Sequence, residues 1–112
     1  MKRALVLAPT VLAALAVALP ASAATPTYNG TVGPGFTIKL TKKPTKAGKI
    51  KLVVADKASI HNFQIEGPGL DRAVTTVGFT GTKTVRIHLR RGTYKYYCQP
   101  HESSMHGTFK VT

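Results

Sequence analysis

The sequence predicts an all-β protein, a β-sandwich of about seven short strands. Three observations lead to this prediction. No segment beyond Ala24 keeps helical spacing over the length of a helix, many short segments alternate apolar and polar residues or are rich in β-branched residues, and Gly, Pro, Asn or Asp stands at their ends. No internal repeat or linker divides the chain, which indicates a single domain.

Four strands are expected in the first part of this domain. They cover residues 36–40, 49–56, 61–67 and 73–79. The first alternates apolar and polar residues, and a turn-rich lysine segment separates it from the second. The third places Phe63 and Ile65 on one face, and the fourth shows its pattern over a shorter stretch.

Three more strands are expected within residues 82–92, 92–98 and 107–112. Their alternation assigns one set of side chains to the core. The inward set is Val85, Ile87 and Leu89 in the first strand, Tyr94, Tyr96 and Cys98 in the second, and Phe109 and Val111 in the third. Arg86, His88 and Arg90 face water, so His88 is interpreted as a surface histidine.

The amino-terminal segment predicts export. Lys2 and Arg3 precede an apolar run over residues 4–19, and Pro20 and the small residues 21–23 follow it. This is the pattern of a cleavable secretory signal, with cleavage after Ala23, and the run is shorter than the roughly 20 residues of a spanning helix. We therefore expect a signal peptide at residues 1–23 and a secreted or periplasmic domain at residues 24–112, with no transmembrane segment.

The charge of that domain suggests anionic partners. The whole chain has a formal charge of +12, and loss of Lys2 and Arg3 lowers it to +10. Such a balance favours acidic redox proteins or an anionic cell envelope, although a plain solvated surface explains it equally well. The lysines have no aromatic residues interleaved, so a nucleic-acid site is unlikely on this pattern.

The single cysteine is the first sign of a metal site. A free thiol in an oxidising compartment needs a partner chain, burial or a metal. Cys98, His101 and Met105 lie in one short segment beside Pro100, and His61 begins a strand that can meet this loop at one end of a sandwich. A thiolate, two imidazoles and a thioether suit copper in electron transfer, whereas zinc more often takes a second cysteine or a carboxylate.

Four segments resemble the cupredoxins, the type 1 blue copper proteins, and most closely their small exported plastocyanin-like members. They are "TVGPGFTIKL", "IHNFQIEGPG", "GTYKYYC" and "CQPHESSMHGTFKV". The resemblance covers essentially all of residues 24–112. It implies a Greek-key sandwich, one copper ion cycling between Cu(I) and Cu(II), and the ligands His61, Cys98, His101 and Met105.

The resemblance also implies roles around the centre. Asn62 would brace the ligand loop through hydrogen bonds, and His101 would be the electron port, surrounded by an apolar docking surface. The docking residues expected from it are Pro34, Phe36, Pro68 and Pro100. His106, beside Met105, is expected to point away from the metal.

Two features depart from well-known members of the family. The spacing from Cys98 through His101 to Met105 is C-x2-H-x3-M, one residue shorter than in plant plastocyanins. The residue before His61 is Ile60 rather than glycine, which argues against the azurin arrangement with an added backbone carbonyl. Because ligand loops vary in length, these departures bear on the potential and spectrum rather than on the site.

The function implied is single-electron transfer between redox partners, not an enzymatic reaction. Copper storage or delivery through the same ligands is the main alternative, and a basic module that binds anionic polymers is another. A Cys98–His101 nucleophile pair is disfavoured, because Asn62 is the only nearby orienting residue.

Overall fold

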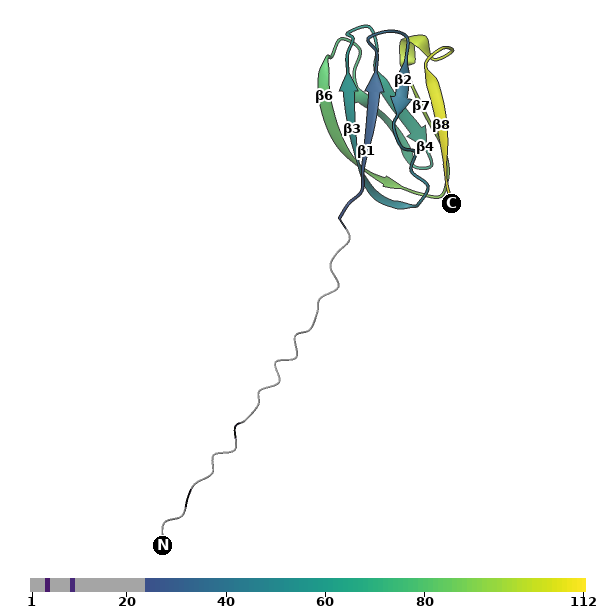
Figure 1. The fold of residues 1–112 in the computed structure, drawn as a ribbon. Helices are drawn as coiled ribbons and strands as arrows, with labels where there is room; N and C mark the ends of the chain where they lie inside the picture. Colours follow the sequence, from purple (N-terminus) through teal and green to yellow (C-terminus); the bar gives the residue numbers. More distant parts are fainter. Residues whose placement is uncertain (1–3, 5–8, 10–23) are drawn as a thin grey trace.

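The computed structural model describes Ala4, Pro9 and residues 24–112, so nearly all of the predicted signal peptide lies outside the described residues. Two four-stranded sheets pack face to face (Figure 1). The elements are β1 Thr27–Val32, β2 Ile38–Leu40, β3 Gly48–Asp56, β4 Phe63–Gly67, β5 Leu70–Thr75, β6 Gly81–Leu89, β7 Gly92–Tyr97, the 3-10 turn η1 Gln99–His101 and β8 His106–Val111. The predicted all-β sandwich is confirmed.

The sheets have the orders β2-β1-β3-β6 and β5-β4-β7-β8. Strands β1 and β3 are parallel, and every other neighbouring pair is antiparallel. The chain changes sheet between β3 and β4, between β5 and β6, and between β6 and β7, which gives the Greek-key pattern. No helix in the described part is long and apolar enough to cross a bilayer.

Two strands differ from the sequence-based expectation. Strand β1 was not predicted, because "TYNGTV" carries no apolar alternation, and it brings the total to eight strands. Strand β5 begins earlier than the predicted strand and ends at Thr75. Residues 76–79 instead form a turn, in which Phe79 N donates to Thr76 O and Gly78 takes a φ of +97°.

The core lies between the two sheets. Alternation in β3 and β6 buries apolar residues from the first sheet, and the second sheet contributes mainly aromatic rings. Tyr94 stacks on Phe109 at 5.1 Å between ring centroids, and Phe63 stacks on Tyr96 at 5.7 Å. Every side chain that the sequence assigned to the core, Cys98 included, is buried.

One glycine makes this aromatic packing possible. The ring of Tyr96 lies across Gly107 of β8, where an added Cβ would approach the ring at 2.3 Å. Any side chain at this position would therefore displace Tyr96 from the core. Tyr96 in turn is two residues from Cys98, so the packing of β7 on β8 positions the end of β7.

The sandwich has two unlike ends. At one end lie the loops of residues 33–37, 57–62, 76–80 and 98–105, because Asp56 pairs with Gly81 and Val32 with Ile38 there. This end is called here the copper pole, after the copper ligands that the resemblance implies in these loops. At the other end, called the basic pole, Gly48 pairs with Leu89, and the loops of residues 41–47 and 90–91 connect the strands. The chain also enters β1 at the basic pole (Figure 1).

Candidate metal centre

The loop that follows β7 folds back on itself. Cys98 is extended, with φ −93° and ψ 120°, and the short turn η1 then begins at Gln99, with Pro100 as its second residue. His101 N donates to Cys98 O at 3.1 Å, and Met105 N donates to His101 O at 2.8 Å. Cys98 N donates to Met105 O at 3.0 Å, which closes the loop at its base. The three residues are thus brought together by local backbone geometry.

His61 completes a triangle of donor atoms with this loop. Its Nδ1 lies 3.1 Å from His101 Nδ1, and Cys98 Sγ lies 3.6 Å from each of these nitrogens. Metal bonds of about 2.0–2.3 Å, spread at about 100–120°, would place three donors about 3–4 Å apart. The triangle therefore has the dimensions of a trigonal metal site with one sulfur and two nitrogens.

The ring of His61 is held in the orientation that a ligand needs. Its Nε2 lies 2.9 Å from Gly35 O, which can only accept, so Nε2 carries the proton and Nδ1 presents a lone pair to the triangle. Gly33, at φ +72°, lies against the other side of the ring, and an added Cβ would meet His61 Cδ2 at 3.2 Å. The β1–β2 loop therefore seats a fully buried imidazole.

Asn62 connects the two loops that supply the donors. Its Oδ1 accepts a hydrogen bond of 2.7 Å from Gln99 N, next to Cys98. The amide side chain is 1 % exposed, so this bond is shielded from water. The residue that the resemblance marked as a brace thus contacts the backbone of the ligand loop.

Met105 lies at the end of this loop with its side chain completely buried. It belongs to the same buried cluster as Cys98, and its carbonyl is paired with the Cys98 amide. A thioether is a weak, soft donor that could supply a fourth, axial contact to copper. His101 differs from the other three candidate ligands, because it is partly exposed.

Phe36 covers the triangle from the solvent side. Its ring meets the rings of His101 and His61 edge to face, at centroid distances of 4.9 and 5.3 Å. Although it shields the imidazoles, Phe36 is itself 60 % exposed. An exposed aromatic ring in contact with a half-buried candidate ligand gives the copper pole an apolar tip.

The structure groups only three of the four expected docking residues. Pro34, Phe36 and Pro100 are exposed in loops of the copper pole. Pro68 lies in the β4–β5 turn at the opposite pole, where its ring would meet a Cβ added at Gly92. It therefore lies apart from the other three, because β4 runs from the copper pole at Phe63 to the opposite pole at Gly67.

Two exposed apolar residues at the copper pole were missed. Ile60 directly precedes His61, and Val77 lies in the β5–β6 turn, which Gly78 N joins to Ser59 O at 2.7 Å. They are 53 % and 51 % exposed. The signal that could have identified both residues is an apolar side chain within an otherwise polar turn. Together with Phe36, they widen the apolar tip.

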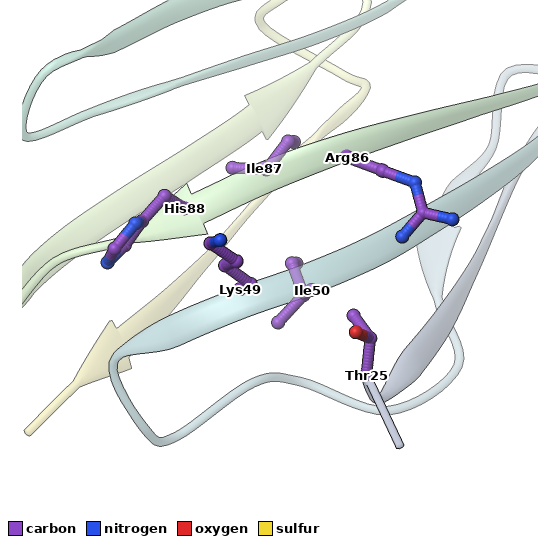
Figure 2. Close-up of a pocket in the computed structure, with 6 residues that line it drawn as sticks. All are labelled: Thr25, Lys49, Ile50, Arg86, Ile87 and His88. Atoms are coloured by element: carbon purple, nitrogen blue, oxygen red, sulfur yellow. The ribbon is translucent and has the colours of Figure 1, made fainter. Parts of the chain in front are cut away.

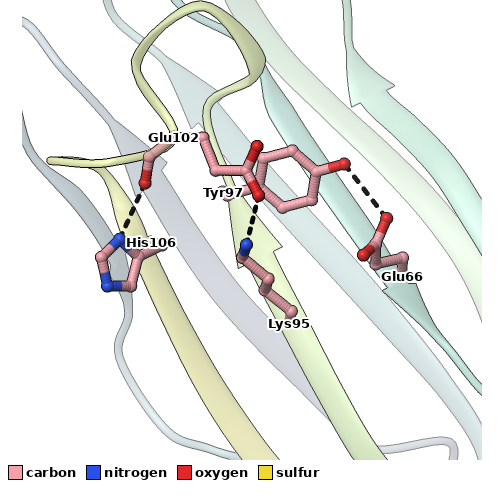
Figure 3. Close-up of polar contacts among 5 residues, drawn as sticks. All are labelled: Glu66, Lys95, Tyr97, Glu102 and His106. Carbon is pink, nitrogen blue, oxygen red and sulfur yellow. Dashed lines mark hydrogen bonds and ion pairs between the residues drawn. The ribbon is translucent and has the colours of Figure 1, made fainter.

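A polar cluster supports the ligand loop from outside (Figure 3). Glu102 forms an ion pair with Lys95 of β7, and its carbonyl accepts a hydrogen bond of 2.8 Å from His106 Nδ1. Lys95 also lies over the ring of Tyr97, 4.8 Å from its centroid. His106 is exposed, in agreement with its predicted orientation, and so is His88 on β6.

Tyr97, which belongs to the same cluster, has an unusually high pKa. Its hydroxyl donates to Glu66 Oε2 at 3.1 Å. Burial of the phenol, together with the hydrogen bond to Glu66, raises the pKa of Tyr97 to about 12. The side chain therefore stays neutral and keeps its hydrogen bond far above neutral pH.

The sandwich and the Cys-His-His triangle at one pole define a cupredoxin. The chain belongs to the copper binding proteins of the plastocyanin/azurin family, whose model matches residues 23–112. No curated protein sequence matches it. With the donor set described above, this identifies a protein that binds one copper ion in a type 1 site.

Solved structures show the same fold. Reduced rusticyanin is 26 % identical and aligns with a TM-score of 0.57 over 81 % of each chain. A methionine-to-leucine variant of rusticyanin is 24 % identical, with a TM-score of 0.59 over 81 % of this chain and 79 % of that one. A methionine-to-glutamine variant of amicyanin in the Cu(I) state is 17 % identical, with a TM-score of 0.53 over 77 % of this chain and 82 % of that one.

Proposed function

We propose that the protein carries single electrons between redox partners outside the cytoplasm, through one copper ion held by His61, Cys98, His101 and Met105. The observation that carries the proposal is the triangle of Cys98 Sγ and the two Nδ1 atoms, with separations of 3.1 to 3.6 Å. Copper bound there would supply a Cu(I)/Cu(II) couple and need no bond of a substrate to form or break.

The surrounding residues support rapid transfer by holding the donors still. His61 is fixed by Gly35 O, and the ligand loop is fixed by Asn62 and by its own backbone hydrogen bonds. Cys98, His61 and Met105 are all 0 % exposed, so water cannot compete for their donor atoms. A donor set that does not rearrange suits a centre that must hold both oxidation states.

His101 is the proposed electron port. It is the one candidate ligand that reaches the surface, and the exposed ring of Phe36 is in contact with it. Such a tip supports brief docking of a partner without a large interface. The basic charge favours a partner with an acidic surface.

Export is part of the proposal. Residues 1–23 have the sequence of a cleavable signal peptide, and the matched family model begins at residue 23. Determining the amino-terminal residue of the protein recovered from outside the cytoplasm tests this step. An end at Ala24 is expected, and an intact Met1 would contradict cleavage.

The central experiment is a titration of residues 24–112 with Cu(II), followed by reduction with ascorbate and reoxidation. We expect an intense visible band of the Cu(II)–thiolate type that bleaches on reduction and returns on oxidation at one equivalent of copper. A protein that bound copper without this band would indicate storage or delivery instead. A matched His88→Ala variant, changed far from the triangle, should titrate like the unaltered protein.

A further inference from the structure

The outer face of the first sheet carries a cluster of basic side chains. Lys49 and Lys51 of β3 point outward, and in the strand register they stand opposite His88 and Arg86 of β6. Figure 2 shows Lys49, Arg86 and His88 projecting from the two strands around a shallow groove. Like charges directly opposite each other in a sheet, as Lys51 and Arg86 are, are destabilising, so packing alone does not explain this arrangement.

No acidic side chain is paired with these basic residues in the part of the chain that the structure describes. The whole sequence has only four acidic residues. Asp56 is buried at the copper pole, Glu66 accepts from Tyr97, Asp71 accepts from Gln64, and Glu102 pairs with Lys95. The positive face is therefore free to attract an anion from outside the chain.

Loops at the same end extend this positive charge. The β2–β3 loop contributes Lys42, Lys43 and Lys46, which are all exposed. The β6–β7 turn contributes Arg90 and Arg91, also exposed. Most of the charge is thus gathered at the basic pole, at the far end of the strands from His101.

The attachment point of the amino-terminal segment indicates which anion meets this surface. Thr25 lines the groove of about 310 Å³ together with Lys49, Arg86 and His88. The apolar run of residues 4–19 ends only a few residues before Thr25. Before the proposed cleavage, while that run is held in the export membrane, the end of the sandwich nearest to the bilayer is therefore the basic pole.

We propose that the basic pole binds the anionic headgroups of a lipid bilayer, with the copper pole directed away from the membrane. Each basic side chain at an anionic surface adds to the attraction, and the two loops and the sheet face provide a cluster of the size that such surfaces recognise. The proposal goes beyond electron transfer and does not depend on the ligand assignment, because no residue of the basic pole contacts the triangle.

The test measures binding of residues 24–112, which contain both sheets and the whole core, to sedimented vesicles. The vesicles are phosphatidylcholine alone or phosphatidylcholine with an equal amount of phosphatidylglycerol. The test variant is Lys49→Gln/Lys51→Gln/Arg86→Gln. The matched control, Lys39→Gln/Lys57→Gln/Lys83→Gln, removes the same charge from positions nearer the copper pole.

The unaltered protein should bind the mixed vesicles and not the neutral ones. The test variant should lose about a hundredfold in affinity, since each of three charges accounts for about fivefold at such a surface, while the control loses much less. Equal losses in both variants, or no binding to mixed vesicles, would overturn the proposal. So would capture by soluble polyphosphate without vesicle binding, which would identify a polymer as the ligand.

Two further measurements separate this test from the copper assignment. Circular dichroism confirms that each variant is folded. Vesicle binding is repeated with Cys98→Ser protein, which should bind as tightly as the unaltered protein even if it holds no copper. Loss of vesicle binding on that substitution would contradict a membrane surface at the basic pole, whereas loss of colour alone would leave it standing.

Discussion

Asn62 and Gln99 are joined by a hydrogen bond of 2.7 Å that ties the strand entry carrying His61 to the loop carrying Cys98 and His101. Strands β4 and β7 are neighbours in one sheet, but their register ends at Gln64 and Tyr97, before the donors begin. The side chain of Asn62 therefore links the two strands beyond the point where their backbone pairing ends.

Substitution of Asn62 should loosen this connection. Asn62→Ala leaves the backbone amide of Gln99 without its acceptor, and we expect a loss of about 0.5–1.5 kcal/mol in the free energy of unfolding. Urea unfolding of copper-free and copper-loaded protein measures it. Asn62→Asp keeps an acceptor oxygen and should restore much of the visible spectrum that the alanine variant alters. Equal spectra for the two variants would argue against a bracing role.

Replacement of the thiolate should remove the colour but not the fold. Cys98→Ser is a nearly isosteric change at one buried atom, and the core strands do not depend on the metal. We expect no intense visible band with Cu(II) and an unchanged far-ultraviolet circular dichroism spectrum. His106→Ala, a matched change at an exposed imidazole in the same segment, should keep the band. A persistent band in Cys98→Ser would show that the thiolate assignment is wrong.

Met105 should control the potential rather than the presence of copper. A glutamine at this position offers an oxygen in place of the thioether, and such an axial donor favours Cu(II). We therefore expect Met105→Gln to retain one copper ion and to have a lower midpoint potential, measured by redox titration. An unchanged potential would show that Met105 is not an axial ligand.

Phe36 and Pro68 provide a test of the docking surface. Phe36→Ser removes an exposed ring in contact with His101, so electron self-exchange between oxidised and reduced copies should slow severalfold. Nuclear magnetic resonance line broadening measures that rate. Pro68→Ser changes an apolar side chain at the opposite pole and should leave the rate unchanged. A similar effect of both substitutions would mean that the apolar tip is not the contact.

Tyr97 should make stability fall in strongly alkaline solution. Its pKa is about 12 in the folded protein, against an ordinary value of 10.0 in the unfolded chain. Between these values the unfolded chain releases its proton first, so the folded state loses stability as the pH rises from about 10 to about 12. Denaturant unfolding across this range should show that slope, and Tyr97→Phe should reduce it. An unchanged slope would contradict the assignment.

Much of the fold could be predicted because alternation is a local signal. In β6, Val85, Ile87 and Leu89 face the core as expected, since a strand between turns has only two faces to choose from. Strand β1 escaped prediction because its parallel pairing with β3 spans a long stretch of chain and buries few apolar side chains. Its formation depends on the partner strand rather than on its own pattern.

The candidate metal centre, too, could be predicted only where the sequence carries a local signal. Cys98, His101 and Met105 were accessible to sequence reasoning because a short loop brings them together, and His61 because it begins a strand. The acceptor of the His61 Nε2 proton, Gly35 O, could not be predicted, since a backbone carbonyl carries no sequence signal. Pro68 was misplaced because composition does not reveal at which end of a sandwich a turn lies.

The hydrogen bond from Cys98 N to Met105 O closes the ligand loop at its base, between the end of β7 and the start of β8. The register of β7 on β8 ends at Tyr97 and His106, outside this closure, so the length of the loop can differ without shifting that register. Natural variation in the loop can thus retune the metal while the scaffold stays constant. In this architecture the properties of the redox centre and the durability of the fold are free to evolve separately.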